Sequence, residues 1–203
     1  MATLTDALRV YRYNRSTGLL AGLNAVLREY KRRGCRFTPK VLERIVFGDH
    51  QEWLRHHKYV NHRTLLREAS CVLRNYWPLR RTFATFEDLY ESVRHDTENI
   101  CGVGHRTIYD IALRIGFLYY EPLLPKEYVY IQAGALKGIV NLSSDPLYSH
   151  LFPPRAWAAG AYYPVSDFTA AFGPMESMFI EDFLCVFHKE LSGLGSYTIK
   201  QLQ

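Results

Sequence analysis

The residues best suited to hold a ligand form a short corner between residues 100 and 107. Two glycines flank an apolar residue there, and three side chains able to donate hydrogen bonds follow: Gly102, Val103, Gly104, His105, Arg106 and Thr107. Glycine permits backbone dihedrals and close approaches that a side chain forbids. The backbone amides at the start of the helix that follows are open, and the helix dipole favours negative charge beside them. The chemistry expected of this corner is therefore anion binding.

Two amphipathic helices are expected to position the corner. Thr85 opens the first in the manner of a capping box with Asp88, and the helix runs to about residue 98. The second begins at about His105 and buries one apolar face, made of Ile108, Ile111, Ala112 and Ile115. Val103 is expected to plug the turn between the two helices. The alternative is a tight corner between helices that holds no ligand.

This arrangement resembles the helix-hairpin-helix motif, in which a Gly-apolar-Gly core joins two short helices. In that family the anion is a phosphate of the DNA backbone, which the hairpin contacts without reading the base sequence. The resemblance implies that the amides of residues 104–107 contact phosphate, with further donors from His105, Arg106 and Thr107. Double-stranded DNA is therefore the favoured ligand.

A longer stretch carries a second resemblance. It reads Tyr109-Asp110-x-Ala112-x-Arg114-Ile115-Gly116, and then Pro125-x-x-x-Val129-Tyr130-x-x-Ala133-Gly134. This pattern is similar to that of a group of uncharacterised bacterial proteins with the same kind of hairpin, and it implies no particular activity. The chain departs from that group at Gln132, where the group tends to have histidine. Within the stretch, Asp110 is a candidate to pair with Arg106 or Arg114.

The charge of the chain is unevenly distributed. Residues 1–81 contain 17 Lys and Arg against 6 Asp and Glu, whereas residues 82–203 contain 8 against 14. A basic stripe concentrates polyanions, and each phosphate contact makes binding sensitive to salt. The basic residues expected to contact nucleic acid, besides the corner, are Lys31, Arg32, Arg33, Arg36 and Lys58. The alternatives are mutual attraction of the two oppositely charged halves, or a protein-interaction module with an acidic partner and no nucleic-acid ligand.

Two enzyme classes compete with simple binding. DNA glycosylases with this hairpin add a catalytic Lys beside it, or an Asp about one helix further on, whereas this chain has His105 and Arg106 and no such Lys. Arg55 and His62 resemble the Arg-x(4–6)-His motif of HEPN ribonucleases, in which His is a general acid or base and Arg stabilises charge. The alternative for these two residues is a basic helix end in contact with phosphate or solvent.

No other motif of an enzyme site is present. The chain has no Walker loop, Rossmann fingerprint or His-Glu-x-x-His pattern, and no recognisable arrangement of a nucleophile with its base. No cofactor and no metal are expected. The four cysteines, Cys35, Cys71, Cys101 and Cys185, are scattered and are predicted to be buried small apolar residues of a reducing, cytoplasmic environment.

The fold class expected is mainly α. Apolar residues recur at helical spacing through residues 1–120, over 4–13, 16–33, the segment opened by Thr38 and Pro39, and 62–76. Residues 121–191 carry seven prolines and many aromatics, which predicts ordered loops with short helices at 128–140 and 175–191. Residues 192–203 are predicted to form a loose tail. A single domain is expected over residues 1–203.

The composition excludes several classes of protein. Apolar residues make up 48% of the chain, aromatic residues 14% and charged residues 22%, which is typical of a folded globular protein. No apolar run approaches the ~20 residues that cross a bilayer, so no membrane association is expected. The first residues lack the basic-then-apolar order of a secretion signal, which favours a cytoplasmic location.

Overall fold

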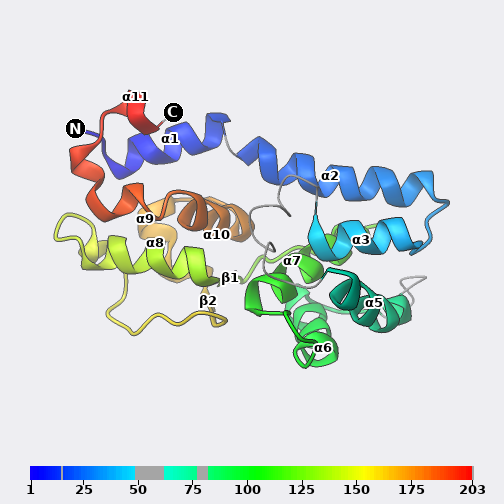
Figure 1. Ribbon diagram of the computed structural model, residues 1–203. Coiled ribbons are helices and arrows are strands. Elements are labelled where there is room, and N and C mark those ends of the chain that lie inside the picture. The colour runs from blue at the N-terminus through cyan, green and yellow to red at the C-terminus, as the bar shows by residue number, and fades with distance from the viewer. Residues whose placement is uncertain (15, 49–61, 77–81, 203) are drawn as a thin grey trace. The chain divides into compact units, whose positions relative to one another are not determined.

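The computed structural model describes residues 1–14, 16–48, 62–76 and 82–202, and most of these residues are helical. The chain divides into two compact units (Figure 1), one formed by Leu20–Leu124 and the other by Met1–Leu19 together with Pro125–Gln203. The expected mainly α fold class is confirmed. The single domain expected over residues 1–203 stays a prediction.

The unit of residues 20–124 is built from helices alone within its described part. They are α2 (Ser16–Arg32, from residue 20), α3 (Pro39–Phe47), α5 (His62–Leu73), the 3-10 helix η1 (Arg74–Tyr76), α6 (Phe86–Thr97) and α7 (His105–Gly116). Gly34 follows α2 with a φ of 66°, a left-handed conformation that suits glycine. Pro39 opens α3, where its missing amide costs no hydrogen bond.

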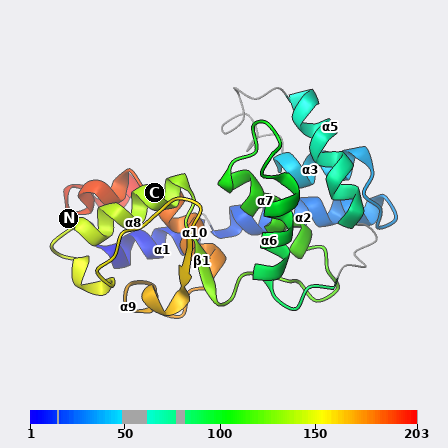
Figure 2. The ribbon, with the colours of Figure 1, turned by 90° about the horizontal axis from the view of Figure 1, so that it is seen from below.

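Helix α7 occupies the centre of this unit. It packs against both α6 and α3, and α3 also packs against α5. Figure 2 shows α6 and α7 side by side. The apolar face predicted for α7 is almost completely buried at Ile108, Ile111, Ala112 and Ile115, and so are the α3 residues Leu42, Ile45 and Val46. The apolar spacing of the sequence therefore identifies the packed faces correctly.

The other unit combines helices with one small sheet. Its elements are α1 (Leu4–Asn14), β1 (Tyr128–Tyr130), α8 (Ala133–Ser144), η2 (Ser149–Leu151), β2 (Tyr162–Pro164), η3 (Val165–Asp167), α9 (Thr169–Phe172), α10 (Ser177–Val186), η4 (Glu190–Ser196) and α11 (Ile199–Leu202). Strands β1 and β2 pair antiparallel, with Tyr130 opposite Tyr162. The hydroxyl of Ser177 at the start of α10 donates a hydrogen bond to the carbonyl of Tyr128, which ties this strand to the helix.

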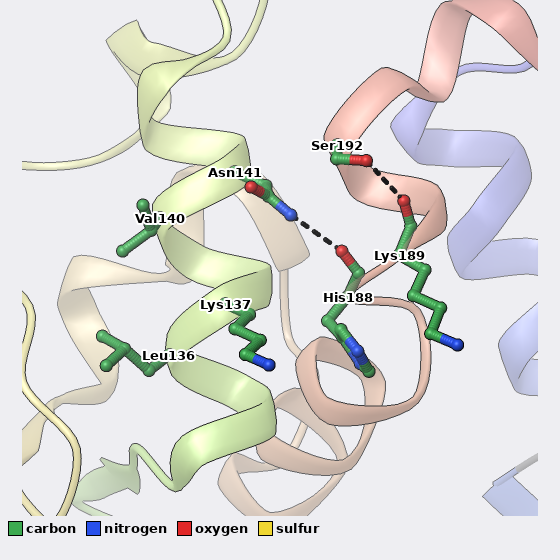
Figure 3. Close-up of a pocket in the computed structure, with 7 residues that line it drawn as sticks. All are labelled: Leu136, Lys137, Val140, Asn141, His188, Lys189 and Ser192. Carbon is green, nitrogen blue, oxygen red and sulfur yellow. Dashed lines mark hydrogen bonds between the residues drawn. The ribbon is translucent and has the colours of Figure 1, made fainter.

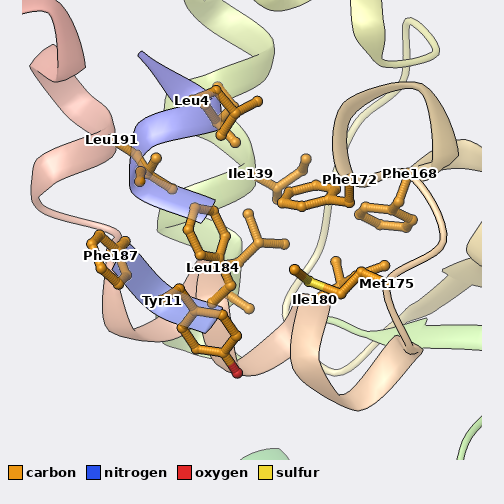
Figure 4. Close-up of a cluster of buried hydrophobic side chains, with 14 of the residues drawn as sticks. Leu4, Tyr11, Ile139, Phe168, Phe172, Met175, Ile180, Leu184, Phe187 and Leu191 are labelled. Carbon is orange, nitrogen blue, oxygen red and sulfur yellow. The ribbon is translucent and has the colours of Figure 1, made fainter. Parts of the chain in front are cut away.

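An aromatic core holds the second unit together. Figure 4 shows side chains of α1, α8, α9 and α10 converging on it, with Tyr11, Phe172 and Leu184 fully or almost fully buried. Helices α8 and α10 pack closely, because Gly138 has no side chain where α10 passes: a Cβ there would lie 2.3 Å from the carbonyl oxygen of Leu184. Close packing of this kind makes the core sensitive to single added atoms.

Two predicted elements of this unit are corrected. Residues 128–130 form a strand, and the helix expected over 128–140 begins only at Ala133. Residues 192–202 contain most of η4 and all of α11 instead of a loose tail, and Leu202 is only 6% exposed. The amide of Ala2 donates a 2.7 Å hydrogen bond to the carbonyl of Tyr197, so the two chain ends lie together, as Figure 1 shows.

Two further properties concern the surface. Cys35, Cys71 and Cys101 are exposed and Cys185 is partly buried, so the prediction that the cysteines are buried is wrong. Among the described residues, none of the helices combines the length and the apolar character that crossing a bilayer requires.

Candidate nucleic-acid interface

The approach to the corner is fixed by the start of α6. The side-chain oxygen of Thr85 accepts a hydrogen bond from the amide of Asp88, and the Asp88 carboxylate accepts one from the amide of Thr85, each over 3.1 Å. This reciprocal pair is the predicted capping box, and it is confirmed. Helix α6 then ends at Thr97, one residue before the predicted end.

The turn between α6 and α7 is a compact series of local hydrogen bonds. The amide of Ile100 donates to the carbonyl of Thr97, and the amide of Val103 donates to the carbonyl of Ile100, each over 3.0 Å. Gly102 has a φ of 88°, a left-handed conformation that is costly for any residue with a side chain. Val103 is half-buried between the two glycines. The chain therefore reverses within a few residues and delivers Gly104 to the start of α7.

Gly104 is the N-cap of α7 and leaves the helix start open. No side chain caps this helix, and a Cβ on Gly104 would meet no other atom within 4 Å. The first backbone bond of the helix runs from the amide of Ile108 to the carbonyl of Gly104, over 3.1 Å. The three preceding amides have no acceptor inside the helix, as at every α-helix start. The corner therefore offers donors at the positive end of the helix dipole.

The side chains at the start of α7 differ in their exposure to solvent. His105 is exposed, and Arg106 is partly exposed with its Nε 3.7 Å from the carboxylate of Asp110. Thr107, predicted to donate to the anion, is only 5% exposed, so little of this residue is open to solvent. Thr107 lies one helical turn before Ile111 and so shares the packed face of α7. The spacing of Thr107 to the apolar residues of α7 is the feature of the sequence that indicates its burial.

Asp110 forms ion pairs within the corner helix, and Arg114 joins that helix to α3. Asp110 lies 3.7 Å from both Arg106 Nε and Arg114 Nη2, so both of the predicted pairings occur. Arg114 also donates through Nη1 to the carbonyls of Ile45 and Val46, over 3.1 and 3.4 Å, at the end of α3. A guanidinium at this place satisfies carbonyls that a helix end leaves open. This role of Arg114 was not predicted from the sequence.

The predicted basic cluster at the end of α2 contains a buried acid. Glu29 accepts hydrogen bonds from Arg32 Nη2 over 2.7 Å and from Arg33 Nε over 3.0 Å. The Arg32 bond is the larger cause, with the Arg33 bond second, that lowers the pKa of Glu29 to about 2. The side chains of the two arginines remain 64% and 43% exposed. They are therefore held in place by Glu29 while they still face solvent.

The remaining predicted contacts have different outcomes. Lys31 and Arg36 are exposed at the same end of α2. Arg55 and Lys58 lie outside the described residues, and His62 is the first residue of α5. The ribonuclease-like pair of Arg55 and His62 therefore stays a prediction.

The excess positive charge of the chain belongs to the unit that contains the corner. Residues 20–124 carry 17 Lys and Arg and 12 Asp and Glu, whereas the residues of the other unit carry 8 of each kind. Glu98 is an exposed acid within the turn itself. The unit that contains the corner is therefore positive in sum, although carboxylates also lie close to the corner in the sequence.

No known protein provides an independent guide to this site. No family model, curated protein or solved structure matches the chain. Within the described residues, no three side chains of His, Cys, Asp or Glu come together in a group that could hold a metal ion.

Proposed function

We propose that the chain binds nucleic acid, with double-stranded DNA favoured, through backbone phosphates at the corner between α6 and α7. One observation carries this proposal: Gly102 has a left-handed backbone, and Gly104 follows it as an N-cap without a side-chain cap and with open space around it. A phosphate oxygen supplies both the acceptor that the first amides of α7 need and the negative charge that the helix dipole favours. Contacts of this kind position a duplex without reading its bases.

The charge of the surrounding unit supports a polyanion over a small neutral ligand. His105 and Arg106 stand at the start of α7, and Lys31 and Arg36 are exposed at the end of α2. Each phosphate that such groups neutralise releases counterions, so the affinity falls as salt rises. About three phosphate contacts correspond to a slope of roughly −3 in a plot of log K against log salt concentration. The proposal keeps the cytoplasmic location expected from the sequence.

Fluorescence anisotropy with a labelled duplex tests this proposal. The wild-type chain is titrated at two salt concentrations, beside a Lys31→Glu/Arg36→Glu variant. These two positions are preferable to Arg32 and Arg33, because reversing those charges would leave the buried Glu29 without its partners. The matched control is Lys126→Glu/Lys200→Glu, which makes the same change of charge at exposed positions of the other unit.

The affinity for the duplex is expected to fall steeply as the salt concentration rises. Of the two variants, only Lys31→Glu/Arg36→Glu is expected to bind the duplex more weakly than the wild type. A duplex affinity that ignores salt, or that falls equally in the control, would overturn the proposal. A single-stranded RNA of equal length, titrated in parallel, tests the preference for duplex DNA. Tighter binding of the RNA would refute that preference.

A further inference from the structure

A second polar site lies in the unit that does not contain the corner. A surface cavity of about 540 Å³ opens between α8 and the segment that follows α10. Its polar lining comes from Lys137 and Asn141 on one face of α8, and from His188, Lys189 and Ser192. Figure 3 shows the side chains of Lys137 and Asn141 turned toward the segment of His188, with the Asn141 amide directed at the His188 carbonyl. The cavity therefore has basic side chains from two segments that are far apart in the sequence.

His188 is held in a defined orientation and protonation pattern. Its Nδ1 lies 2.7 Å from the carbonyl oxygen of Cys185, and its own carbonyl accepts a 2.8 Å hydrogen bond from Nδ2 of Asn141. A carbonyl oxygen can only accept, so Nδ1 carries the hydrogen. Nε2 is then the nitrogen of the ring that remains for a ligand. It accepts a hydrogen bond when it carries no hydrogen and donates one when it does.

The two lysines of this cavity have no acidic partner among the described ion pairs. Neither Lys137 nor Lys189 forms a salt bridge within the described residues, and none of the residues that line the cavity is acidic. Glu190 adjoins Lys189 in the sequence, but it does not line the cavity and its Oε2 is buried. The hydroxyl of Ser192 donates to the carbonyl of Lys189 over 2.7 Å, which steadies that backbone. Two ammonium groups therefore face solvent without a counter-charge from the part of the chain that the structure describes.

We propose that this cavity binds the phosphoryl group of a small molecule. Lys137 and Lys189 supply point charges that can donate to several oxygens of a tetrahedral anion, whereas a carboxylate has only two oxygens to share among them. A phosphate group offers either a hydroxyl that donates or an oxygen that accepts, and a ring nitrogen of histidine can meet either one. Nε2 of His188 accepts a hydrogen bond from a phosphate hydroxyl, or donates one to a phosphate oxygen. Either state places one hydrogen between ring and phosphate.

Titration with inorganic phosphate, followed by NMR at constant ionic strength, tests the proposal. Saturable shifts are expected for the ring signals of His188 and for the backbone amides of Lys189 and Ser192. A Lys137→Ala/Lys189→Ala variant should bind phosphate at least roughly tenfold more weakly than the wild type, because it lacks two charge-assisted donors. The matched control is Lys126→Ala/Lys200→Ala, which removes the same charge at exposed positions that do not line the cavity. Acetate at the same concentration should bind more weakly than phosphate.

The opposite results would overturn the proposal. Shifts that do not saturate, or equal weakening in both double variants, would mean an adventitious ion only. His188→Gln keeps a polar side chain but lacks the ring nitrogen Nε2, and an unchanged phosphate affinity in this variant would also contradict the proposal. The circular dichroism of every variant should match that of the wild type, and the exposure of both lysines makes that the expected outcome.

The same variants separate this site from duplex binding. The Lys31→Glu/Arg36→Glu variant should bind inorganic phosphate as tightly as the wild type, whatever its affinity for DNA. If Lys137→Ala/Lys189→Ala lowers duplex affinity and leaves inorganic phosphate unaffected, the cavity serves a nucleic-acid backbone and the small-molecule proposal fails. Failure of the duplex titration alone leaves this site standing, since the two tests use different residues.

Discussion

The hydroxyl of Tyr11 donates a 2.8 Å hydrogen bond to the carboxylate of Asp182, which joins helix α1 to helix α10. The ring of Tyr11 is fully buried and meets the ring of Phe183 edge-on, with 5.5 Å between the centroids. Burial, followed by the charge of Asp182, raises the pKa of Tyr11 far above its ordinary value. The phenol therefore stays protonated and serves as a permanent donor. This contact fastens the first helix of the chain to the core built by its last third.

Tyr11→Phe removes this donor and leaves the ring in place. The free energy of unfolding should fall by about 1 kcal/mol, because the partly buried Asp182 carboxylate loses a hydrogen bond. Urea denaturation of the wild type and the variant measures the difference. The control is Tyr13→Phe, at a residue 84% exposed, which should change stability by less than about 0.5 kcal/mol. Equal stability of both variants and the wild type would contradict the role given to Tyr11.

Gly138→Ala tests the close approach of α8 and α10. The added Cβ would lie 2.3 Å from the carbonyl oxygen of Leu184, so one of the two helices must shift. Overpacking of this kind should lower the free energy of unfolding by about 2 kcal/mol, although alanine favours the helix. Thermal unfolding measures this effect.

The matched control for this prediction is Gly18→Ala. Gly18 lies in α2, and a Cβ on it would meet no atom within 4 Å. Only the helix propensity of alanine then acts, and the free energy of unfolding of the variant should rise by about 0.5 kcal/mol. A Gly138→Ala variant as stable as Gly18→Ala would show that α8 and α10 do not pack as described.

Local signals in the sequence predicted most helices, and their failures have physical causes. The capping box at Thr85 and the apolar stripe of α7 each specify one helix, because both are read within a few residues. Strand β1 could not be predicted in this way, since three residues such as Tyr128–Tyr130 give no period that separates strand from helix. Its pairing with β2 depends on residues far along the chain.

The sequence predicts the backbone of the candidate site better than it predicts the contacts of the side chains. Two glycines around Val103 indicate a sharp turn, and that turn is present. The spacing of Glu29 to Arg32 and Arg33 permits ion pairs at one helical turn, but only the structure shows that both arginines bind one buried carboxylate. Charge counting cannot reveal such neutralisation, because it ignores which groups meet.

Glu29→Gln should change the pH dependence of stability. Arg32 and Arg33 lower the pKa of Glu29 from its ordinary value of 4.5 to about 2 in the folded chain. Because its pKa is lowered in the folded chain, the ionised Glu29 stabilises the fold, and this contribution is complete above pH 4.5. The contribution is lost as the pH falls through about 2. The variant should therefore be less stable than the wild type at pH 7, and the gap should close between about pH 4.5 and 2.

Urea denaturation midpoints at pH 7, 4 and 2.5 measure this gap. Glu43→Gln is a suitable control, because Glu43 is an exposed partner of Lys40 on α3 and its side chain is 44% exposed. Exposed pairs of that kind contribute little to stability. A gap between wild type and Glu29→Gln that stays constant with pH would refute the paired state of Glu29.

Gly104→Asp gives the most direct test of phosphate binding at the corner. Aspartate is a favoured N-cap residue, and its carboxylate can accept hydrogen bonds from the amides at the start of α7. The variant should melt at the same temperature as the wild type or higher, while its affinity for duplex DNA falls at least roughly tenfold, because the carboxylate occupies the place of the phosphate. Unchanged duplex affinity in a variant that folds normally would contradict the account.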